Sequence, residues 1–576
     1  MLTTPWGESL NPNRVLPEYP RPQLRRNSYL NLNGYWDYAI TETDEEPTGW
    51  DGRILVPFSP ESPLSGVGRT LLPGQTLWYR LRLSLPEGFA CQDGRVLLHF
   101  GAVDQEAAVY VNGVEVCRHM GGYNAFSADI TRALQPENTL LVRVHDDTDA
   151  SFHTRGKQKT RRGGIWYTPQ SGVWQTVWME SVPSTYITGL RLTPLYDESA
   201  LEVTVLCGEN APCRMELEGR SLSLTANRPA KVPMPDFRPW SPEDPYLYAC
   251  SFTLGQDLVE SYFAMRKTEV RPDASGTPRL FLNGKPYFHN GLLDQGYWPD
   301  GLYTPPADEA MIFDIQTAKS LGYNMLRKHI KVEPMRWYYH CDRLGMLVWQ
   351  DMPSGGGKYR LTTISLPLIT GLHHNDHRYR RFARQDEAGR REYLTQLKEM
   401  VSQLYNVPSL ALWVPFNEGW GQFDAARVAA LLRRWDPTRP IDHASGWHDQ
   451  GAGDFQSSHV YFKPYRFRKD RRGRAVILSE FGGYNLREAG HCYNEADFGY
   501  KKLPDRAALW QAYERLFESQ ILPAVSKGLC AAVYTQLSDV EDELNGVLTY
   551  DRRVVKLPAD ALRRLNRRLL DASPKA

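Results

Sequence analysis

The sequence predicts a (β/α)8 TIM barrel preceded by a jelly-roll-like β-sandwich and an immunoglobulin-like β-sandwich. From Tyr287 onward, short apolar runs alternate with helical patterns, which is typical of a parallel barrel. Before residue 270, short segments alternate apolar and polar side chains between turn residues, as antiparallel sandwiches do. The run PDASGTP, residues 272–278, separates the two patterns. We therefore expect three domains, over residues 1–182, 183–270 and 271–576.

The first domain, residues 1–182, is expected to be the sugar-binding type of sandwich. Strand-like segments lie at 77–83, 96–100 and 108–111. Asn112-Gly113 predicts a tight hairpin, because both central positions of a type I′ turn need positive φ. The alternating segment 172–182 predicts the last strand of this domain.

The second domain, residues 183–270, continues the strand pattern and has the size of a small immunoglobulin-like sandwich. Its strand-like segments include 189–194 and 201–205. The segment FAMRKTEV, residues 263–270, is expected to be its closing strand.

The third domain contains eight candidate barrel strands, separated by helical patterns that often end at glycine. The candidate strands are 288–293, 324–329, 346–350, 410–416, 439–443, 456–461, 475–480 and 529–535. The helical patterns include 308–322, 333–345 and 506–528.

Two of these predicted strands end in a glutamate. The apolar run 411–416 stops at Asn417-Glu418, and the run 475–478 leads into Ser479-Glu480. Catalytic groups of a barrel lie at the carboxyl ends of its strands. Glycosidic bond cleavage needs two carboxylates facing one cavity, one to protonate the leaving oxygen and one to stabilise or capture the sugar carbon. The alternative is that each glutamate caps a strand or pairs with an arginine. The recurrence of the pattern favours catalysis by Glu418 and Glu480.

Further side chains near the predicted strand ends are candidates for sugar binding. Each of them could instead belong to an ion pair or to the hydrophobic core. These candidates are Asn417, Arg327, His329, His459, Tyr461, Trp447, Tyr534 and Asp294.

The long insertion 354–384 is expected to form a wall of the pocket. It contains His373, His374, Asp376 and His377, but their spacing matches no hydrolytic zinc motif. We therefore predict no catalytic metal and no cofactor. The oxygen ligands of a structural Na⁺ or Mg²⁺ leave no spacing signature, so the sequence leaves such an ion open.

Charge and cysteine content narrow the classes of partner. The chain has 68 Lys and Arg against 67 Asp and Glu, a net charge of +1. The net charge therefore creates no overall electrostatic field that would attract nucleic acid or an anionic membrane. The eight cysteines form no CxxC pair, and we read neither a signal peptide nor a membrane span, so we expect reduced thiols and a cytoplasmic protein. The expected partner is a small carbohydrate, with a homo-oligomer left open.

These residues also resemble glycoside hydrolase family 2, the group of β-galactosidases, β-glucuronidases and β-mannosidases. The similarity covers nearly the whole chain. Its most specific stretches are VPFNEGWG (414–421) and LSEFGG (478–483). Others are NLNGYWDY (31–38), VYVNGVEV (109–116), GVWQTVWME (172–180), FLNGKPYFHNG (281–291), GYNMLRKH (322–329) and DRLGMLVWQDMP (342–353).

The resemblance implies a retaining exo-β-glycosidase. Glu418 would be the general acid/base, Asn417 would contact the sugar 2-hydroxyl, and Glu480 would be the nucleophile. Arg327 and His329 match the family's second strand, and His459 with Tyr461 its sixth, more loosely.

The sugar is the less defined part of the prediction. The Asn-x-Lys pair of the family's β-glucuronidases is absent after Glu480, and the acidic segment 535–552 stands in that region. An acidic rim suits a neutral sugar unless its charges are paired, so β-galactosides are the first expectation. The alternatives are a β-uronide, through loop cations at Lys463, Arg466, Lys501 or Lys502, and a catalytically silent carbohydrate-binding protein. Transglycosylation is left open as well.

Overall fold

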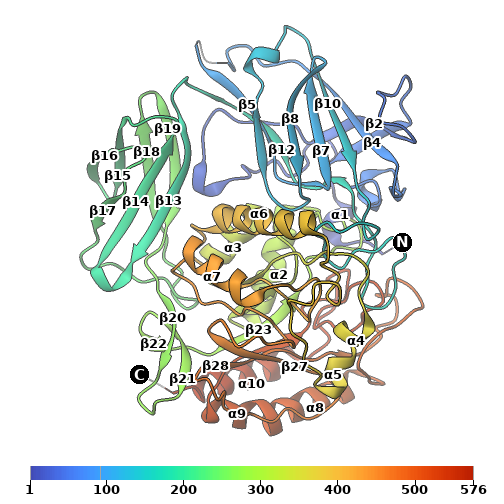
Figure 1. Ribbon diagram of the computed structural model, residues 1–576, viewed down its shortest axis with the longest axis vertical. Helices are drawn as coiled ribbons and strands as arrows, with labels where there is room; N and C mark the ends of the chain where they lie inside the picture. Colours follow the sequence, from blue (N-terminus) through green and yellow to red (C-terminus); the bar gives the residue numbers. More distant parts are fainter. Residues whose placement is uncertain (1, 91–92, 575–576) are drawn as a thin grey trace.

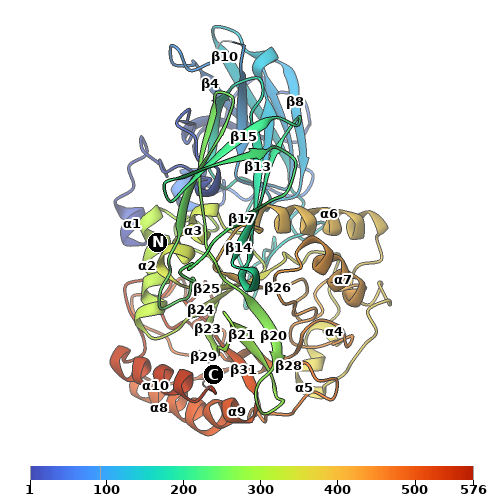
Figure 2. The ribbon, with the colours of Figure 1, turned by 90° about the vertical axis from the view of Figure 1, so that its left-hand side faces the viewer.

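The protein is a barrel with two β-sandwiches stacked on it, which confirms the predicted fold class. A computed structural model describes residues 2–90 and 93–574. The first sandwich lies above the barrel in Figure 1, and the second lies beside the first and reaches down along the barrel. Figure 2, turned by 90°, shows both sandwiches on the same side of the barrel.

The first sandwich packs two antiparallel sheets against each other. Apolar side chains from both sheets, Leu98 and Val142 among them, form its core. One sheet contains β1 (Leu30–Asn31), β12 (Val177–Val182), β5 (Arg95–Phe100) and β9 (Phe126–Asp129). The other contains β3 (Gly52–Val56), β2 (Gly34–Thr41), β4 (Thr76–Leu83), β10 (Asn138–His145), β7 (Glu106–Val111) and β8 (Val114–Met120).

The predicted hairpin is confirmed, since Asn112 and Gly113 join β7 to β8 with φ of 52° and 79°. The predicted last strand, 172–182, is in fact two. The short strand β11 (Gly172–Val173) pairs with β6 (Val103–Asp104), whereas β12 belongs to the four-stranded sheet. The chain turns between β11 and β12 at Trp174, whose N–H donates to Ala102 O.

The second sandwich has a three-stranded and a four-stranded sheet around its own core. The first contains β13 (Ile187–Leu195), β14 (Ala200–Cys207) and β17 (Ala230–Pro233). The second contains β16 (Arg220–Thr225), β15 (Pro212–Leu217), β18 (Tyr248–Leu254) and β19 (Asp257–Phe263).

The predicted closing strand 263–270 is wrong. The last strand of the sandwich, β19, ends at Phe263, and β20 (Thr268–Pro272) pairs instead with β21 (Pro278–Leu282), which also pairs with β22 (Lys285–Pro286). The run 272–278 is the turn of this hairpin rather than a linker, because Asp273 accepts hydrogen bonds from the Ser275 and Thr277 N–H groups. The small sheet lies against one end of the barrel, where Leu280 packs with apolar side chains of the barrel interior.

Seven parallel strands form the barrel wall, in the order β26-β25-β24-β23-β31-β28-β27. Most of their side chains are buried, and β26 and β31 are continuous apolar runs in the sequence, as is typical of such strands. They are β23 (His289–Asp294), β24 (Met325–Lys328), β25 (Leu347–Asp351), β26 (Leu410–Val414), β27 (Phe455–Val460), β28 (Ala475–Gly482) and β31 (Leu529–Thr535).

The expected fifth strand, 439–443, is not a regular strand. Its segment lies between β26 and β27 and makes only isolated bridges, Trp413 with Ile441 and Asn417 with Ser445. Pro440 has no N–H to continue a ladder, and toward β27 the backbone bond recorded is Asp454 N to Ile441 O. The barrel is therefore closed by an irregular segment, which carries Ser445 and Trp447 to the site.

The helices cover the outer face of the barrel through apolar stripes. In α7 (Ala425–Trp435), the buried residues Ala425, Val428, Ala429 and Leu432 recur at helical spacing. The predicted helices 308–322 and 333–345 correspond to α2 (Asp308–Ser320) and α3 (Met335–Leu344). The pattern 506–528 is α8 (Arg506–Leu516), a π-helical turn (Phe517–Ile521) and α9 (Leu522–Lys527). The remaining long helices are α6 (Glu387–Leu404), which lies beneath the first sandwich in Figure 1, and α10 (Ala559–Asp571).

The seven cysteines among the described residues are free thiols, and Cys91 lies outside those residues. Within the described part of the chain, none of the helices combines the length and the hydropathy that a membrane span requires.

Candidate active site

The two predicted glutamates meet at the carboxyl ends of β26 and β28. Glu480 lies within β28, whereas Glu418 follows β26 in a turn with φ of 50°. A positive φ is uncommon for a residue with a side chain. The turn is held because the Glu418 N–H donates to Ser445 O at 2.9 Å, and Trp447 Nε1 donates to Glu418 O at 2.9 Å. The irregular segment that closes the barrel thus fixes the backbone of Glu418.

His459 joins the two carboxylates. Its Nδ1 lies 2.8 Å from Glu418 Oε1 and 3.6 Å from Glu480 Oε2. One oxygen of Glu418 and one of Glu480 lie within 4.8 Å of each other. Retaining glycosidases hold their two carboxyl groups about 5–5.5 Å apart, and inverting enzymes hold them about 6.5–9.5 Å apart. A nearest oxygen-to-oxygen distance of at most 4.8 Å is compatible with the retaining geometry.

The surroundings of the two carboxylates differ. Burial raises the pKa of Glu418 to about 7. The positive charges of Lys157 and Arg327 partly offset this increase, and the negative charge of Glu543 adds to it. Glu480 instead receives hydrogen bonds, from Arg327 Nη1 at 3.1 Å and from the Tyr461 hydroxyl. One group can thus carry a proton near neutral pH while the other is held by donors, the asymmetry that acid and nucleophile roles need.

Arg327 lies beneath the carboxylates and is fully buried. Its five N–H groups are all used inside the protein. Two go to Asp351, at 3.0 and 2.9 Å, and one each to Glu480, Ser479 O and Asn417 Oδ1. No donor of Arg327 is left for a sugar, so Arg327 acts by positioning the residues around it. This corrects the prediction that Arg327 contacts the sugar.

Asn417 presents an unused donor to the site. Arg327 fixes its Oδ1 at 2.9 Å, and its buried Nδ2 has no partner among the described residues. Leaving a buried donor unpaired costs about 1–3 kcal/mol. A sugar hydroxyl arriving at the site can satisfy this amide, as expected for Asn417.

The two predicted histidines are held in neutral form by burial. The pKa of His459 falls to about 4 and that of His329 falls well below its usual range, both chiefly through burial. His329 Nδ1 lies 2.8 Å from Asp351 Oδ2, and His459 Nε2 lies 3.1 Å from Ser445 Oγ. Their rings are therefore oriented by the protein.

Tyr461 and Trp447 also reach the site. Tyr461 stacks on Tyr500 with ring centres 3.9 Å apart while its hydroxyl bonds Glu480. The Trp447 ring meets the His459 ring edge-on at 5.6 Å. Both side chains thus border the carboxylate pair.

Two predicted sugar-binding residues face away from the site. Tyr534 pairs with Leu292 across the sheet, and its ring packs on Tyr513 and Phe517 in the helix layer. Asp294 Oδ2 accepts from Lys328 Nζ at 2.6 Å, on the same outer face. Successive strand side chains alternate between faces, so these two predictions are wrong by one register position. Thr535, next to Tyr534, is the residue that faces inward, with its hydroxyl 3.1 Å from that of Tyr461.

The insertion 354–384 reaches the residues beside Glu418, as expected of a pocket wall. It contains two short helices, α4 (Leu361–Ile364) and α5 (Leu366–Thr370), and Tyr359 stacks near Trp420 at 6.4 Å.

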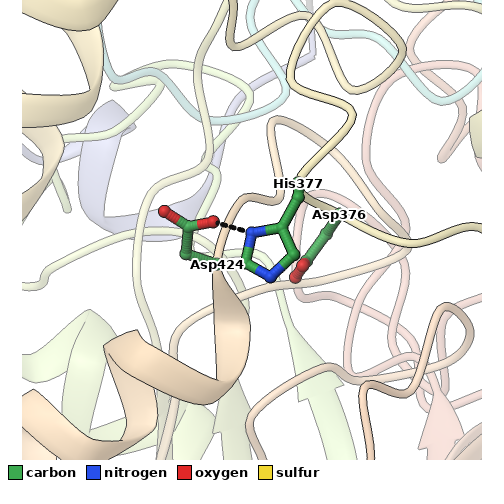
Figure 3. Close-up of side chains that lie close together, drawn as sticks. All are labelled: Asp376, His377 and Asp424. Atoms are coloured by element: carbon green, nitrogen blue, oxygen red, sulfur yellow. Dashed lines mark hydrogen bonds and ion pairs between the residues drawn. The ribbon is translucent and has the colours of Figure 1, made fainter.

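Asp376 and His377 of this insertion lie close to Asp424 (Figure 3). Asp376 accepts from Ala425 N at the start of α7, and Asp424 accepts from His377 at 2.6 Å and from the Tyr379 hydroxyl. These bonds tie the insertion to α7. The absence of a metal here stays a prediction.

The structure also adds residues that the sequence did not single out. The loop 146–171 of the first sandwich brings Lys157, Trp166 and Tyr167 to the barrel, where Lys157 Nζ lies 3.4 Å from Glu543 Oε2. Trp166 approaches Trp420, with ring centres 5.3 Å apart. Lys157 and Glu543 are 386 positions apart in the chain, so no local signal could join them. An alignment of the two loops across homologues is the kind of signal that finds such pairs.

Comparison with known proteins assigns two of the domains to one family. Residues 69–179 match the sugar-binding domain and residues 280–480 the TIM-barrel domain of the glycosyl hydrolases family 2 models. The β-glucuronidase of Rattus norvegicus is 24% identical over 65% of this chain and 60% of its own length. The β-galactosidase of Thermoanaerobacter pseudethanolicus is 23% identical over 63% of this chain and 48% of its own length.

Solved structures share the fold over nearly the whole chain. The β-D-glucuronidase of Dictyoglomus thermophilum has a TM-score of 0.72 at 18% identity and covers 96% of this chain and 98% of its own. The β-galacturonidase of Eisenbergiella tayi, bound to galacturonate, has a TM-score of 0.69 at 17% identity and covers 96% and 99%. Because the two domain models together match more than half of its residues, the chain belongs to glycosyl hydrolases family 2.

Proposed function

We propose that the protein is a retaining exo-β-glycosidase with Glu480 as nucleophile and Glu418 as acid/base. The observation that carries this proposal is the carboxylate pair, with oxygens within 4.8 Å of each other and unlike surroundings. In the first step, a Glu480 oxygen bonds to the anomeric carbon while Glu418 gives its proton to the departing glycosidic oxygen. In the second, Glu418 takes a proton from water, whose oxygen displaces Glu480.

The protein's own groups support each step. Arg327 and Tyr461 hold Glu480 in place for attack, and Asn417 Nδ2 is the donor for the sugar 2-hydroxyl. Burial keeps Glu418 protonated below about pH 7, which suits a general acid working near neutral pH.

For the sugar, we propose a β-uronide in place of the neutral β-galactoside first expected. Three carboxylates of the acidic segment after β31 have cationic partners, which weakens the objection to an anionic substrate. Glu541 and Asp542 pair with Arg162 at 2.6 and 2.5 Å, and Asp539 pairs with Lys556 at 2.6 Å. Relatives named β-glucuronidase and a neighbouring structure named β-galacturonidase also support a uronide.

The loop cations named as alternatives do not supply the charge. Lys463, Arg466, Lys501 and Lys502 are exposed, and Lys502 pairs with Asp497. Besides Arg327, whose donors are all used, Lys157 is a buried cation whose charge acts on Glu418.

A neutral β-galactoside is the second candidate, for one specific reason. The Glu543 carboxylate adds to the pKa of Glu418 and so lies near it, and a carboxylate readily accepts bonds from sugar hydroxyls. The named β-galactosidase relative is consistent with this candidate.

A panel of p-nitrophenyl β-glycosides tests the proposal, with glucuronide, galacturonide, galactoside, glucoside, mannoside, fucoside and arabinopyranoside. We expect uronide turnover by the wild type and none by Glu480→Gln. Glu387→Gln, an exposed change at the start of α6, is the matched control and should keep full activity. Turnover that persists in Glu480→Gln would contradict the assignment.

Two results would point elsewhere. A folded wild type that binds sugars without any turnover would be a carbohydrate-binding protein. Glycosyl transfer to an added sugar acceptor, measured by product analysis, would indicate transglycosylation from the same intermediate.

A further inference from the structure

The loop 146–171, between β10 and β11, is clamped onto the barrel. Arg162 pairs with Glu541 and Asp542, and the Thr168 N–H donates to Glu541 Oε1 at 3.0 Å. On the other side, Arg155 donates to Gly356 O at 2.6 Å. The first sandwich thus supplies a fixed part of the barrel's site, held by ion pairs at one end and by the insertion 354–384 at the other.

Lys157 is the buried cation that this loop carries. Its side chain is 7% exposed. Its charge is the largest one lowering the pKa of Glu418, and it also lowers the pKa of His329. Trp166 of the same loop lies 5.3 Å from Trp420, and the Trp420 ring lies 6.1 Å from that of His329, measured between ring centres. The loop that carries Lys157 therefore reaches the site beside His329.

The hydrogen bonds of Lys157 are incomplete. An ammonium has three donors, and the recorded acceptors are Glu543 Oε2 and the Tyr167 hydroxyl, both at 3.4 Å. Charge-assisted bonds of this kind are normally about 2.7–2.9 Å long. No acceptor within residues 2–90 and 93–574 is recorded for the third donor. The site thus holds a buried ammonium ready for a closer anionic partner.

Glu543 explains why the buried ammonium of Lys157 is tolerated. Its Oε2 also accepts from the Tyr167 hydroxyl, so the carboxylate is shared between Tyr167 and Lys157. A lone buried charge would be costly, and a counter-charge reduces that cost. Glu543 therefore lowers the cost of burying Lys157 while leaving part of the hydrogen-bonding capacity of Lys157 free.

We propose that Lys157 binds the carboxylate of the sugar in the glycone site, so that the first sandwich determines selectivity for uronides. This inference rests on the proposed β-uronide function. In this arrangement the barrel supplies the two catalytic carboxylates. The sandwich loop supplies the cation that binds the carboxylate at carbon 6 of the sugar. Without this cation, an anionic sugar would meet Glu543 and Glu480 with repulsion.

Paired substrates that differ only at carbon 6 test the inference: glucuronide with glucoside, and galacturonide with galactoside. Lys157→Met should lower kcat/KM for the uronide about 100-fold or more, and change it for the neutral partner less than 5-fold. Each variant is compared at its own pH optimum, since removing Lys157 raises the pKa of Glu418. Lys157→Arg keeps the charge and should retain most uronide turnover. Arg161→Gln, an exposed cation of the same loop, is the control and should behave as wild type.

Glu543→Gln provides the reciprocal test. It keeps an acceptor for Tyr167 and removes a negative charge, so the ratio of uronide to neutral turnover should rise. A fall in this ratio would overturn the inference.

Equal losses on both partners of a substrate pair in Lys157→Met would also overturn it. If Lys157→Met does not fold, the wild type still decides, because free uronate should inhibit at least 30-fold more tightly than the matching neutral sugar. Equal inhibition contradicts the inference.

These results separate the inference from the proposed function. A wild type inactive on every glycoside refutes the function. A wild type that turns over uronides with no selective loss in Lys157→Met refutes the inference alone.

Discussion

The raised pKa of Glu418 leads to a pH dependence that replacing the residue should abolish. With a pKa of about 7, about 90% of Glu418 is protonated at pH 6 and about 10% at pH 8. An ordinary glutamic acid would be almost fully ionised at both. If Glu418 is the general acid, wild-type kcat/KM should fall about tenfold per pH unit above pH 7.

Glu418→Ala should remove that limb and discriminate between leaving groups. General acid catalysis contributes about 10²–10⁴-fold, or about 3–5 kcal/mol. The variant should therefore lose this much on alkyl glycosides, whose leaving oxygen needs a proton. It should form the glycosyl-enzyme from p-nitrophenyl glycosides within about tenfold of the wild-type rate, because nitrophenolate needs no proton.

Steady-state kinetics from pH 5 to 9 on both substrate classes, with the burst of nitrophenol measured separately, provides the assay. Glu387→Ala, at an exposed position, is the control. The reasoning is refuted if both substrate classes lose the same factor, or if the limb near pH 7 remains in Glu418→Ala.

The other predictions concern stability and the positioning of Glu480. Because the folded pKa of Glu418 is raised from 4.5 to about 7, its ionisation should lower stability by up to about 3 kcal/mol as pH rises between these values. Glu418→Gln should remove this loss, so its free energy of unfolding in urea should differ less between pH 5 and pH 8 than that of the wild type. The same difference in both proteins would count against this prediction. Arg327→Met leaves the buried Asp351 and Glu480 carboxylates without their cation and should cost about 3–5 kcal/mol in urea unfolding, whereas a loss below about 1 kcal/mol would contradict the contacts described. Tyr461→Phe keeps the ring but removes a hydrogen bond to Glu480, and should lower kcat about 10- to 100-fold at unchanged melting temperature; an unchanged kcat would mean that the hydroxyl does not position the nucleophile.

Local signals predicted the elements whose cause is local. The Asn112-Gly113 hairpin follows from two residues that accept positive φ, and barrel strands such as β26 and β31 follow from apolar runs of the right length. Glu418 and Glu480 were recognisable because each follows such a run after a single polar residue. The expected strand 439–443 does not form as a regular strand, because Pro440 has no N–H to donate to a neighbour. Whether such a short run pairs depends on the strands beside it.

Side-chain direction was less accessible to sequence reasoning. Tyr534 and Asp294 lie near strand ends, as expected, but they face the helices. A shift of one residue reverses the face, and only the register between β23, β24 and β31 defines it. Arg327 shows the same limit, since its position was predicted but its five internal bonds depend on β25, on β28 and on the turn after β26.

The sequence by itself determined the fold class and the two carboxylates, because short, continuous stretches of residues are enough to recognise them. Tertiary structure alone decided what surrounds those carboxylates. The cation Lys157 reaches the site from another domain, and its partner Glu543 is 386 positions away in the chain. Burial, charge and hydrogen bonding are set by such distant neighbours, and these determine the pKa of Glu418 and, as we propose, the charge of the sugar.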